Sequence, residues 1–144
     1  AIRYARERKI PFLGICVGMQ MLATKGYENG EFAGLDWISG EVKKINNQNN
    51  NLKIPHMGWN NIKFNRAHDI WFELDNKNEE TTAYFVNSYY FKVKNTEDLL
   101  GYCDYGRQIT AVVCKDNIIG CQFHPEKSQK IGLKFIRNFI NWKP

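Results

Sequence analysis

Apolar residues recur along this chain at two different spacings, and each spacing predicts a kind of element. Residues 1–9 place apolar side chains among Arg and Glu at helical intervals, and Pro11 ends that helix. The unbroken apolar run at 10–15 predicts a short buried strand, as found in parallel sheets that helices cover on both faces. Helical spacing returns at 17–26, and Gly26 is the expected C-terminal cap. One side of this second helix carries Met19, Leu22 and Ala23.

The middle of the chain favours strands. Residues 37–45 and 54–64 have strand-like patterns, and the asparagine-rich segment 46–51 between them predicts a polar loop. The strongest β pattern is 83–93, which is rich in aromatic and β-branched residues. These segments are expected to supply strands of a sheet.

The end of the chain predicts a hairpin followed by an amphipathic helix. Residues 109–123 form two apolar runs that turn at Asp116 and Asn117, which both tolerate a positive φ. Helical spacing then continues over 128–142. The apolar residues of this last helix are Ile131, Phe135, Ile136, Phe139 and Ile140. No internal repeat or linker interrupts the pattern, which predicts one mixed α/β domain with a partly parallel sheet.

Length and composition agree with a single domain. The chain has 144 residues, of which 43% are hydrophobic, enough for one core. No apolar run approaches the roughly 20 residues that cross a bilayer, and no signal peptide is visible. We therefore expect a soluble, cytoplasmic protein without a membrane partner. The chain opens at Ala1 directly on a helix, and we expect it to be a fragment of a longer protein.

Charge and cysteine spacing argue against two classes of function. The net charge of +5 comes from scattered basic residues without interleaved aromatics, which does not indicate a nucleic-acid partner. The four cysteines show no CxxC spacing, which argues against a zinc site and a disulfide framework. We expect four free thiols in a reducing compartment, and neither a metal nor another cofactor.

The stretch GICVG, residues 14–18, places Cys16 where a strand passes into a helix. A sharp turn of this kind exposes its central residue and needs small neighbours, which Gly14 and Gly18 provide. The helix N-terminus would lower the pKa of the thiol, and the free N–H of Val17 could hold an oxyanion. The alternative is an inert buried cysteine, and this stretch alone does not decide between the two.

A second group of reactive side chains lies in the stretch FHPE. His124 could move a proton, and on an extended backbone Glu126 would share its side and orient the imidazole. The alternative is an ordinary loop histidine. His68, in a polar stretch, and His56, without a nearby carboxylate, are weaker candidates. The polar residues that could hold a small amide substrate are Gln20, Ser88 and Tyr89.

Four segments together resemble the class I glutamine amidotransferases. They are PFLGICVGMQML, IPHMGWN, YFVNSYY and GCQFHPEKSQKIGLKFIRNF, in the family's order and over nearly the whole chain. Within the family, PHMGWN is most similar to the glutaminase subunits of imidazole glycerol phosphate synthase. The resemblance implies a flavodoxin-like α/β fold with a mixed, partly parallel sheet flanked by helices, here without the family's N-terminal strands.

The resemblance also implies a reaction, the hydrolysis of glutamine to glutamate and ammonia. Cys16 would be the nucleophile, His124 the acid and base, and Glu126 the residue that orients the imidazole. The ammonia would pass through a channel to a (β/α)8 cyclase subunit, in a heterodimer of histidine biosynthesis. The residues implied to bind glutamine are Gly18, Gln20, Asn87, Ser88 and Tyr89, with Val17 as an oxyanion donor. Those implied to face the partner are Met57, Trp59 and Lys127.

Two departures from the family keep other functions open. Members carry a further N-terminal segment with the first strand of the sheet and a glycine-rich loop that completes the oxyanion hole. We therefore expect residues 1–144 to be the C-terminal two-thirds of a single amidotransferase domain. Asn87 stands where histidine-biosynthesis members have His, which allows a glutaminase that feeds a sugar amidotransferase of surface-glycan biosynthesis. A non-catalytic scaffold fragment is the third alternative.

Overall fold

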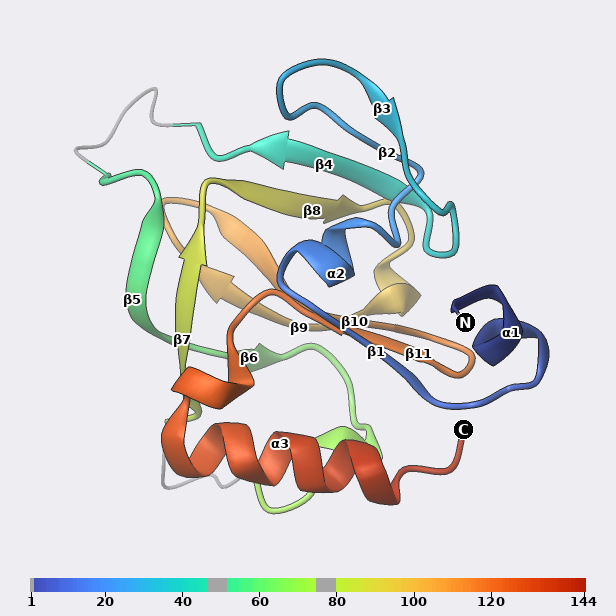
Figure 1. Cartoon of the computed structure of the whole chain (residues 1–144). Coiled ribbons are helices and arrows are strands. Elements are labelled where there is room, and N and C mark those ends of the chain that lie inside the picture. The colour runs from blue at the N-terminus through green and yellow to red at the C-terminus, as the bar shows by residue number, and fades with distance from the viewer. Residues whose placement is uncertain (1, 47–51, 75–79) are drawn as a thin grey trace.

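The apolar run that follows the first helix forms an edge strand of the main sheet. The computed structural model describes residues 2–46, 52–74 and 80–144 (Figure 1). Within these residues the main sheet has five strands, in the order β1 (Phe12–Ile15), β11 (Ile118–Cys121), β10 (Gln108–Lys115), β9 (Leu99–Asp104) and β6 (Lys63–Phe64). β1 and β11 are parallel, and the other neighbours are antiparallel. The predicted mixed, partly parallel sheet is confirmed.

The predicted hairpin at 109–123 is also confirmed. β10 and β11 pair antiparallel, and the chain turns at Asp116, which has a φ of 51°. The Nδ2 group of Asn117 donates to the carbonyl oxygens of Ala5 and Ile10, at 3.2 and 2.7 Å. The turn thereby holds the first helix, α1 (Ile2–Glu7), against the end of the main sheet.

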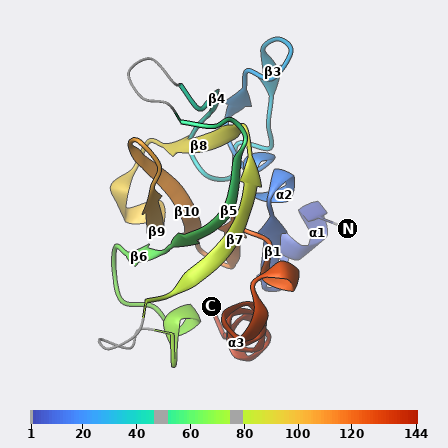
Figure 2. The ribbon, with the colours of Figure 1, turned by 90° about the vertical axis from the view of Figure 1, so that its left-hand side faces the viewer.

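Two smaller sheets accompany the main one. They contain β3 (Phe32–Ala33), β2 (Lys25–Gly26), β4 (Gly40–Lys44) and β8 (Tyr89–Val93) in one sheet, and β5 (His56–Asn61) and β7 (Thr82–Asn87) in the other. Figure 2 shows β5 and β7 as a curved pair. The segment 83–93, which has the strongest β pattern, is divided between both sheets at Ser88, because β7 pairs with β5 and β8 pairs with β4. The predicted polar loop at 46–51 lies, from residue 47 onwards, outside the described residues.

The helix predicted over 17–26 is wrong in its length. α2 (Val17–Gln20) has four residues, and Gly26 pairs with Val42 in the sheet instead of capping a helix. The cause is tertiary: the carbonyl oxygens of the next three residues accept hydrogen bonds from the loop at 35–38 and so cannot continue the helix. The inward side is as predicted, because Met19, Leu22 and Ala23 are all fully buried.

The closing helix is confirmed as α3 (Gln129–Asn141), with one difference on its apolar face. Phe135 is fully buried, but Ile140, predicted to be on the same face, is 73% exposed. Near the C-terminal end of α3 the side chain of Asn138 is buried instead. Its Nδ2 donates to two carbonyl oxygens at the 3-10 turn η1 (Asp69–Trp71). No helix in the described part of the chain is long and apolar enough to cross a membrane.

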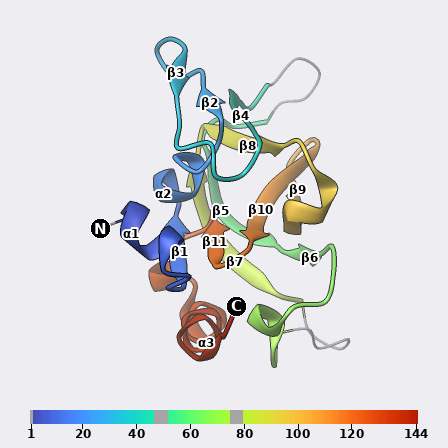
Figure 3. The same ribbon diagram turned by 90° about the vertical axis from the view of Figure 1, so that its right-hand side faces the viewer.

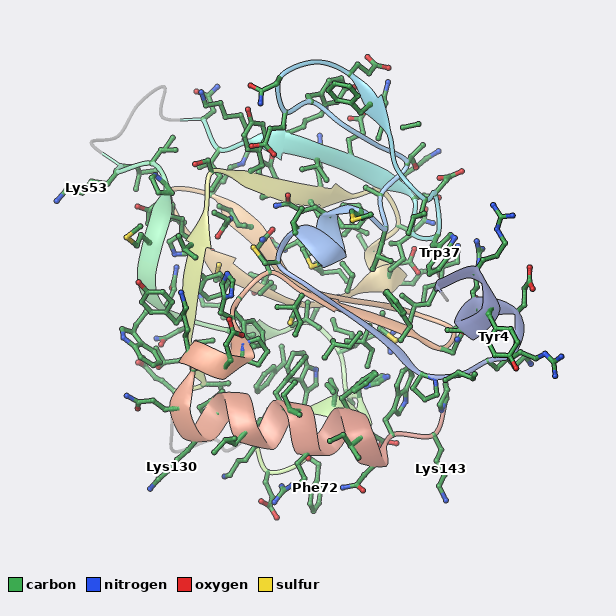
Figure 4. All side chains as sticks on the ribbon, in the orientation of Figure 1. Tyr4, Trp37, Lys53, Phe72, Lys130 and Lys143 are labelled. Carbon is green, nitrogen blue, oxygen red and sulfur yellow. The ribbon has the colours of Figure 1, made fainter. Side chains whose placement is uncertain are left out.

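The main sheet separates two hydrophobic clusters. Met19 and Ile118 belong to the cluster on the α2 side, and Phe135 belongs to the cluster on the α3 side. Figures 1 and 3 show β1 and β11 between these two helices. Trp37 belongs to the cluster on the α2 side and joins α1 to it, because the guanidinium carbon of Arg6 lies 5.2 Å from the centre of the Trp37 ring (Figure 4). The short 3-10 turns elsewhere are η2 (Thr96–Asp98) and η3 (Pro125–Lys127).

Candidate active site

Cys16 occupies a sharp turn between β1 and α2. Its φ of 50° and ψ of −111° form a backbone conformation that costs a non-glycine residue about 1–3 kcal/mol. Gly14 is needed for the turn, since a Cβ there would lie 2.7 Å from the carbonyl oxygen of Gly18. The structure thus contains the strand-to-helix turn expected from the sequence, and the cysteine on it is half-buried.

The parallel pairing of β1 and β11 brings Cys16 to the FHPE stretch. Ile15 pairs with Cys121, and the N–H of Cys16 donates to the carbonyl oxygen of Cys121 at 2.8 Å. Because parallel strands end at the same edge of a sheet, the residues that follow Cys121 leave the sheet beside Cys16. Two segments that are distant in sequence therefore share one sheet edge.

His124 and Glu126 form a hydrogen-bonded pair next to this edge. His124 Nδ1 lies 2.7 Å from Glu126 Oε1, so Nε2 is the ring nitrogen directed away from the carboxylate. Glu126 lies in the 3-10 turn η3, and not on the extended backbone that the sequence predicted. Burial alone would raise the pKa of Glu126, but hydrogen bonds from His124 and from its own backbone N–H lower it below its usual value. The carboxylate is therefore ionised at neutral pH.

The pKa of the Cys16 thiol is raised, and the lowered value expected from a helix N-terminus is wrong. Burial of the thiol is the largest cause, while the Val17 N–H and the Gln122 side chain act in the opposite direction, and the charge of Glu126 raises it further. With only four residues, α2 contributes little dipole. All four cysteines are free thiols, as predicted. Burial raises the pKa values of the other three further, at Cys103 to about 12, at Cys114 to about 11 and at Cys121 well above its usual range.

Three residues expected to bind glutamine meet at one main-chain carbonyl. The carbonyl oxygen of Tyr89 accepts from Gln20 Nε2 at 3.1 Å and from Asn87 Nδ2 at 2.9 Å. Gln20 Nε2 also donates to Gln122 Oε1 at 3.0 Å, so both of its N–H groups are engaged. The side-chain oxygen Oε1 of Gln20 is then the group through which this residue could bind a ligand.

The other two residues of that set lie nearby in the chain. Gly18 is in α2, directly after the turn, and a Cβ added there would meet no atom within 4 Å. Ser88 lies between β7 and β8, directly before Tyr89. A small side chain at position 18 would therefore meet no steric obstacle.

Gln122 belongs to the same site, and sequence reasoning missed it. Its side chain is fully buried, and its Nε2 donates to the sulfur of Cys16 at 3.7 Å. In the described part of the chain, no hydrogen bond joins this sulfur to His124. The signal that could have found Gln122 is a polar residue inside an otherwise apolar run, because a buried amide needs hydrogen-bond partners.

Comparison with known proteins shows the family to which this chain belongs. Residues 1–142 match the family described as glutamine amidotransferase class-I. The chain belongs to this family. Subunits HisH of imidazole glycerol phosphate synthase from Cereibacter sphaeroides and Ruegeria pomeroyi are 49% and 50% identical to it, over 96% and 99% of the chain. The chain spans 64% and 66% of the length of these two relatives.

Solved structures share the amidotransferase fold. A glutamine amidotransferase from Thermotoga maritima matches 97% of this chain with a TM-score of 0.61, at 17% identity, and 51% of its own length is matched. PurLQS from the same organism also matches 97% of the chain, with a TM-score of 0.67 at 16% identity, over 65% of its own length. At these identities the likeness concerns the fold alone. The predicted fold class is confirmed.

The residues expected to face a partner lie on one exposed surface of this amidotransferase chain. Met57 and Trp59 on β5 are 61% and 49% exposed, so Trp59 is not a core aromatic residue. The indole ring lies edge-on to Tyr84 at 5.7 Å, and Lys127 Nζ lies 5.9 Å from the same tyrosine ring. The surface adjoins the pair of His124 and Glu126, because the N–H of His124 donates to the carbonyl oxygen of Tyr84.

The other two histidines have structural surroundings. His56 is 2% exposed and stacks on Phe85 and Tyr105, with ring centroids 4.9 and 4.0 Å apart. His68 Nδ1 accepts a backbone N–H at the start of η1. Among the residues that the structure describes, no group of three or more His, Cys, Asp or Glu is arranged to hold a metal ion.

Proposed function

We propose that this chain carries the catalytic site of a glutaminase, which hydrolyses the side-chain amide of glutamine to glutamate and ammonia. The observation that carries the proposal is the sheet edge that Cys16, on a strained turn, shares with the stretch after Cys121, in which Glu126 holds His124. A nucleophile, a base and an orienting carboxylate are the groups needed for covalent acyl transfer. Membership of the family and the identity with HisH subunits support glutamine as the amide.

The first half of the reaction forms a thioester. Cys16 Sγ attacks the amide carbon of glutamine, and the thiol proton passes to Nε2 of His124. The oxygen of the tetrahedral intermediate becomes negative, and the N–H of Val17 at the start of α2 donates to it. His124 then gives the proton to the departing ammonia. Glu126 holds the imidazole through Nδ1 and stabilises its charged form.

The second half hydrolyses the thioester. Water attacks the thioester carbon while His124 accepts a proton from it. The bond between carbon and sulfur then breaks, the proton returns to the sulfur of Cys16, and glutamate leaves. The residues proposed to hold glutamine during both halves are Gly18, Gln20, Asn87, Ser88 and Tyr89.

We infer further that a synthase partner consumes the ammonia. The HisH relatives are named as subunits of imidazole glycerol phosphate synthase, which supports a partner subunit. We propose that this partner is the (β/α)8 cyclase subunit of histidine biosynthesis, in a cytoplasmic heterodimer. The exposed surface of Met57, Trp59 and Lys127 is its proposed docking face. Because the chain spans about two thirds of those relatives, we propose that it forms the C-terminal two-thirds of a single amidotransferase domain.

Asn87 supports a second candidate for the partner. The resemblance to the histidine-biosynthesis members implies that they usually have His at this position, whereas the Asn87 side chain of this chain is buried and donates to the carbonyl oxygen of Tyr89. A glutaminase that supplies a sugar amidotransferase of surface-glycan biosynthesis would use the same chemistry. Purification of the native complex separates the two candidates, because a cyclase and a sugar amidotransferase differ in mass and in substrate.

Replacement of the nucleophile tests the proposed reaction. In the full-length protein with its synthase, Cys16→Ala should lower ammonia release from glutamine at least about a thousandfold, because no thioester can form. Cys114→Ala, the same change at a buried cysteine outside the site, is the control and should retain most of the activity. If Cys16→Ala releases ammonia at an unchanged rate, the assignment of Cys16 as the nucleophile is overturned. An unaltered protein that releases no ammonia would favour a non-catalytic scaffold.

A further inference from the structure

A series of hydrogen-bonded amides links a main-chain carbonyl to the nucleophile. It runs from the carbonyl oxygen of Tyr89 through the side chains of Gln20 and Gln122 to the sulfur of Cys16, with distances of 3.1, 3.0 and 3.7 Å. Gln122 is fully buried, so solvent offers its amide no other partner. The proposed reaction assigns no role to Gln122, although its donor group is directed at the nucleophile.

The direction of each amide follows from the first acceptor. A main-chain carbonyl oxygen can only accept, so the group that Gln20 presents to Tyr89 is its NH2 group. The same NH2 group faces Gln122, which must therefore present its carbonyl oxygen Oε1 to it. The NH2 group of Gln122 is then left facing Cys16. Turning the Gln122 amide over would oppose two NH2 groups and lose the hydrogen bond to Gln20.

We propose that Gln122 is a positioning residue that stabilises the thiolate form of Cys16, and that Gln20 orients it for this role. A thiolate is a stronger hydrogen-bond acceptor than a thiol, so a donor fixed on the sulfur favours the ionised nucleophile. Such a donor matters at this turn, because α2 is too short to contribute much dipole and burial opposes ionisation. The role rests on the proposed function of Cys16 as the nucleophile and adds a residue to that site.

The side chain of Gln122 can be changed without removing its main-chain contact. The N–H of Gln122 donates to the carbonyl oxygen of Ala111 at 2.8 Å, which any substitution other than proline retains. Gln122→Met keeps the approximate length of the side chain and removes the donor. Gln122→Glu keeps the oxygen that accepts from Gln20 and places a second oxygen at the sulfur.

The pH dependence of Cys16 alkylation tests the inference in the full-length protein. The rate of reaction with iodoacetamide is followed at this residue by peptide mass spectrometry across a pH series. With Gln122→Met, the midpoint of the rate profile should rise by about one pH unit, and the rate at neutral pH should fall about tenfold. Gln122→Glu should raise the midpoint further, and Gln20→Met should raise it less. Gln108→Met, the same change at an exposed glutamine, is the control and should leave it in place.

The three buried cysteines report on folding in the same samples. Protection of Cys103, Cys114 and Cys121 from iodoacetamide shows that a variant is folded. If Gln122→Met is not protected in this way, the midpoints of the folded variants Gln122→Glu and Gln20→Met test the inference. A midpoint that stays unchanged in the folded variants overturns the inference. Ammonia release by the unaltered protein with its synthase is measured in parallel. If the variants raise the midpoint but the unaltered protein releases no ammonia, the role of Gln122 is supported and the glutaminase is refuted. If the unaltered protein releases ammonia but the midpoint stays unchanged in the variants, the glutaminase is supported and the role of Gln122 is refuted.

Discussion

His56 illustrates how burial controls the charge of a single side chain in this protein. Its ring is stacked on Phe85 and Tyr105 and is 2% exposed, and burial lowers its pKa from 6.5 to about 4. The folded chain therefore resists protonation of His56, whereas the unfolded chain does not. The stability that comes from the neutral ring is complete above pH 6.5 and is lost as the pH falls toward 4.

The substitution His56→Phe should reduce this sensitivity to acid. Between pH 6.5 and pH 4, the free energy of unfolding of the unaltered protein should fall by about 3 kcal/mol more than that of the variant. Urea unfolding across a pH series measures both. His68, whose pKa burial also lowers, is present in both proteins and cancels in the difference. Parallel pH profiles for the two proteins would refute this account of His56.

At the scale of elements, the turn between β1 and α2 depends on the size of one residue. A Cβ at Gly14 would lie 2.7 Å from the carbonyl oxygen and 2.8 Å from the carbonyl carbon of Gly18, and backbone atoms cannot move aside easily. Gly18 has open space around the position of a Cβ. The two glycines therefore allow a matched comparison.

Gly14→Ala should lower the free energy of unfolding by about 1–3 kcal/mol and should also lower the proposed glutaminase activity, because the overpacked turn displaces Cys16. Gly18→Ala should change the stability by less than about 0.5 kcal/mol. Urea unfolding of both variants is the measurement. Equal losses of stability, or a larger loss at Gly18, would mean that the turn is not packed in this way.

The elements that the sequence predicted well are those with local causes. The hairpin turn at Asp116, the strand that begins at Phe12 and the amphipathic helix that ends at Asn141 each follow from spacing and turn residues within one segment. The short α2 and the break at Ser88 could not be predicted, because they depend on hydrogen bonds from loop 35–38 and on the pairing of β7 with β5 and of β8 with β4. Periodicity within a segment carries no information about such distant partners.

At the scale of the whole molecule, one parallel strand pair brings together the segments that carry the proposed catalytic residues. β1 comes from the start of the chain and β11 from near its end, so Cys16 and the stretch that contains His124 and Glu126 leave the sheet at the same edge. The sequence could nominate these three residues, because each lies in a short motif and the motifs follow the order of a known family, and their catalytic roles stay a prediction. Gln122 could not be found from the sequence, because its proposed role depends on complete burial and on an amide partner from α2.

The most direct test of the central claim is to trap the glutamyl thioester. The full-length protein with its synthase is mixed with isotopically labelled glutamine, quenched in acid and digested, and its peptides are examined by mass spectrometry. The covalent mechanism predicts a labelled glutamyl group on the peptide that contains Cys16, and none on that peptide from Cys16→Ala. Hydrolysis of glutamine with no label on this peptide, or with the label on another residue, would contradict the assignment of Cys16 as the nucleophile.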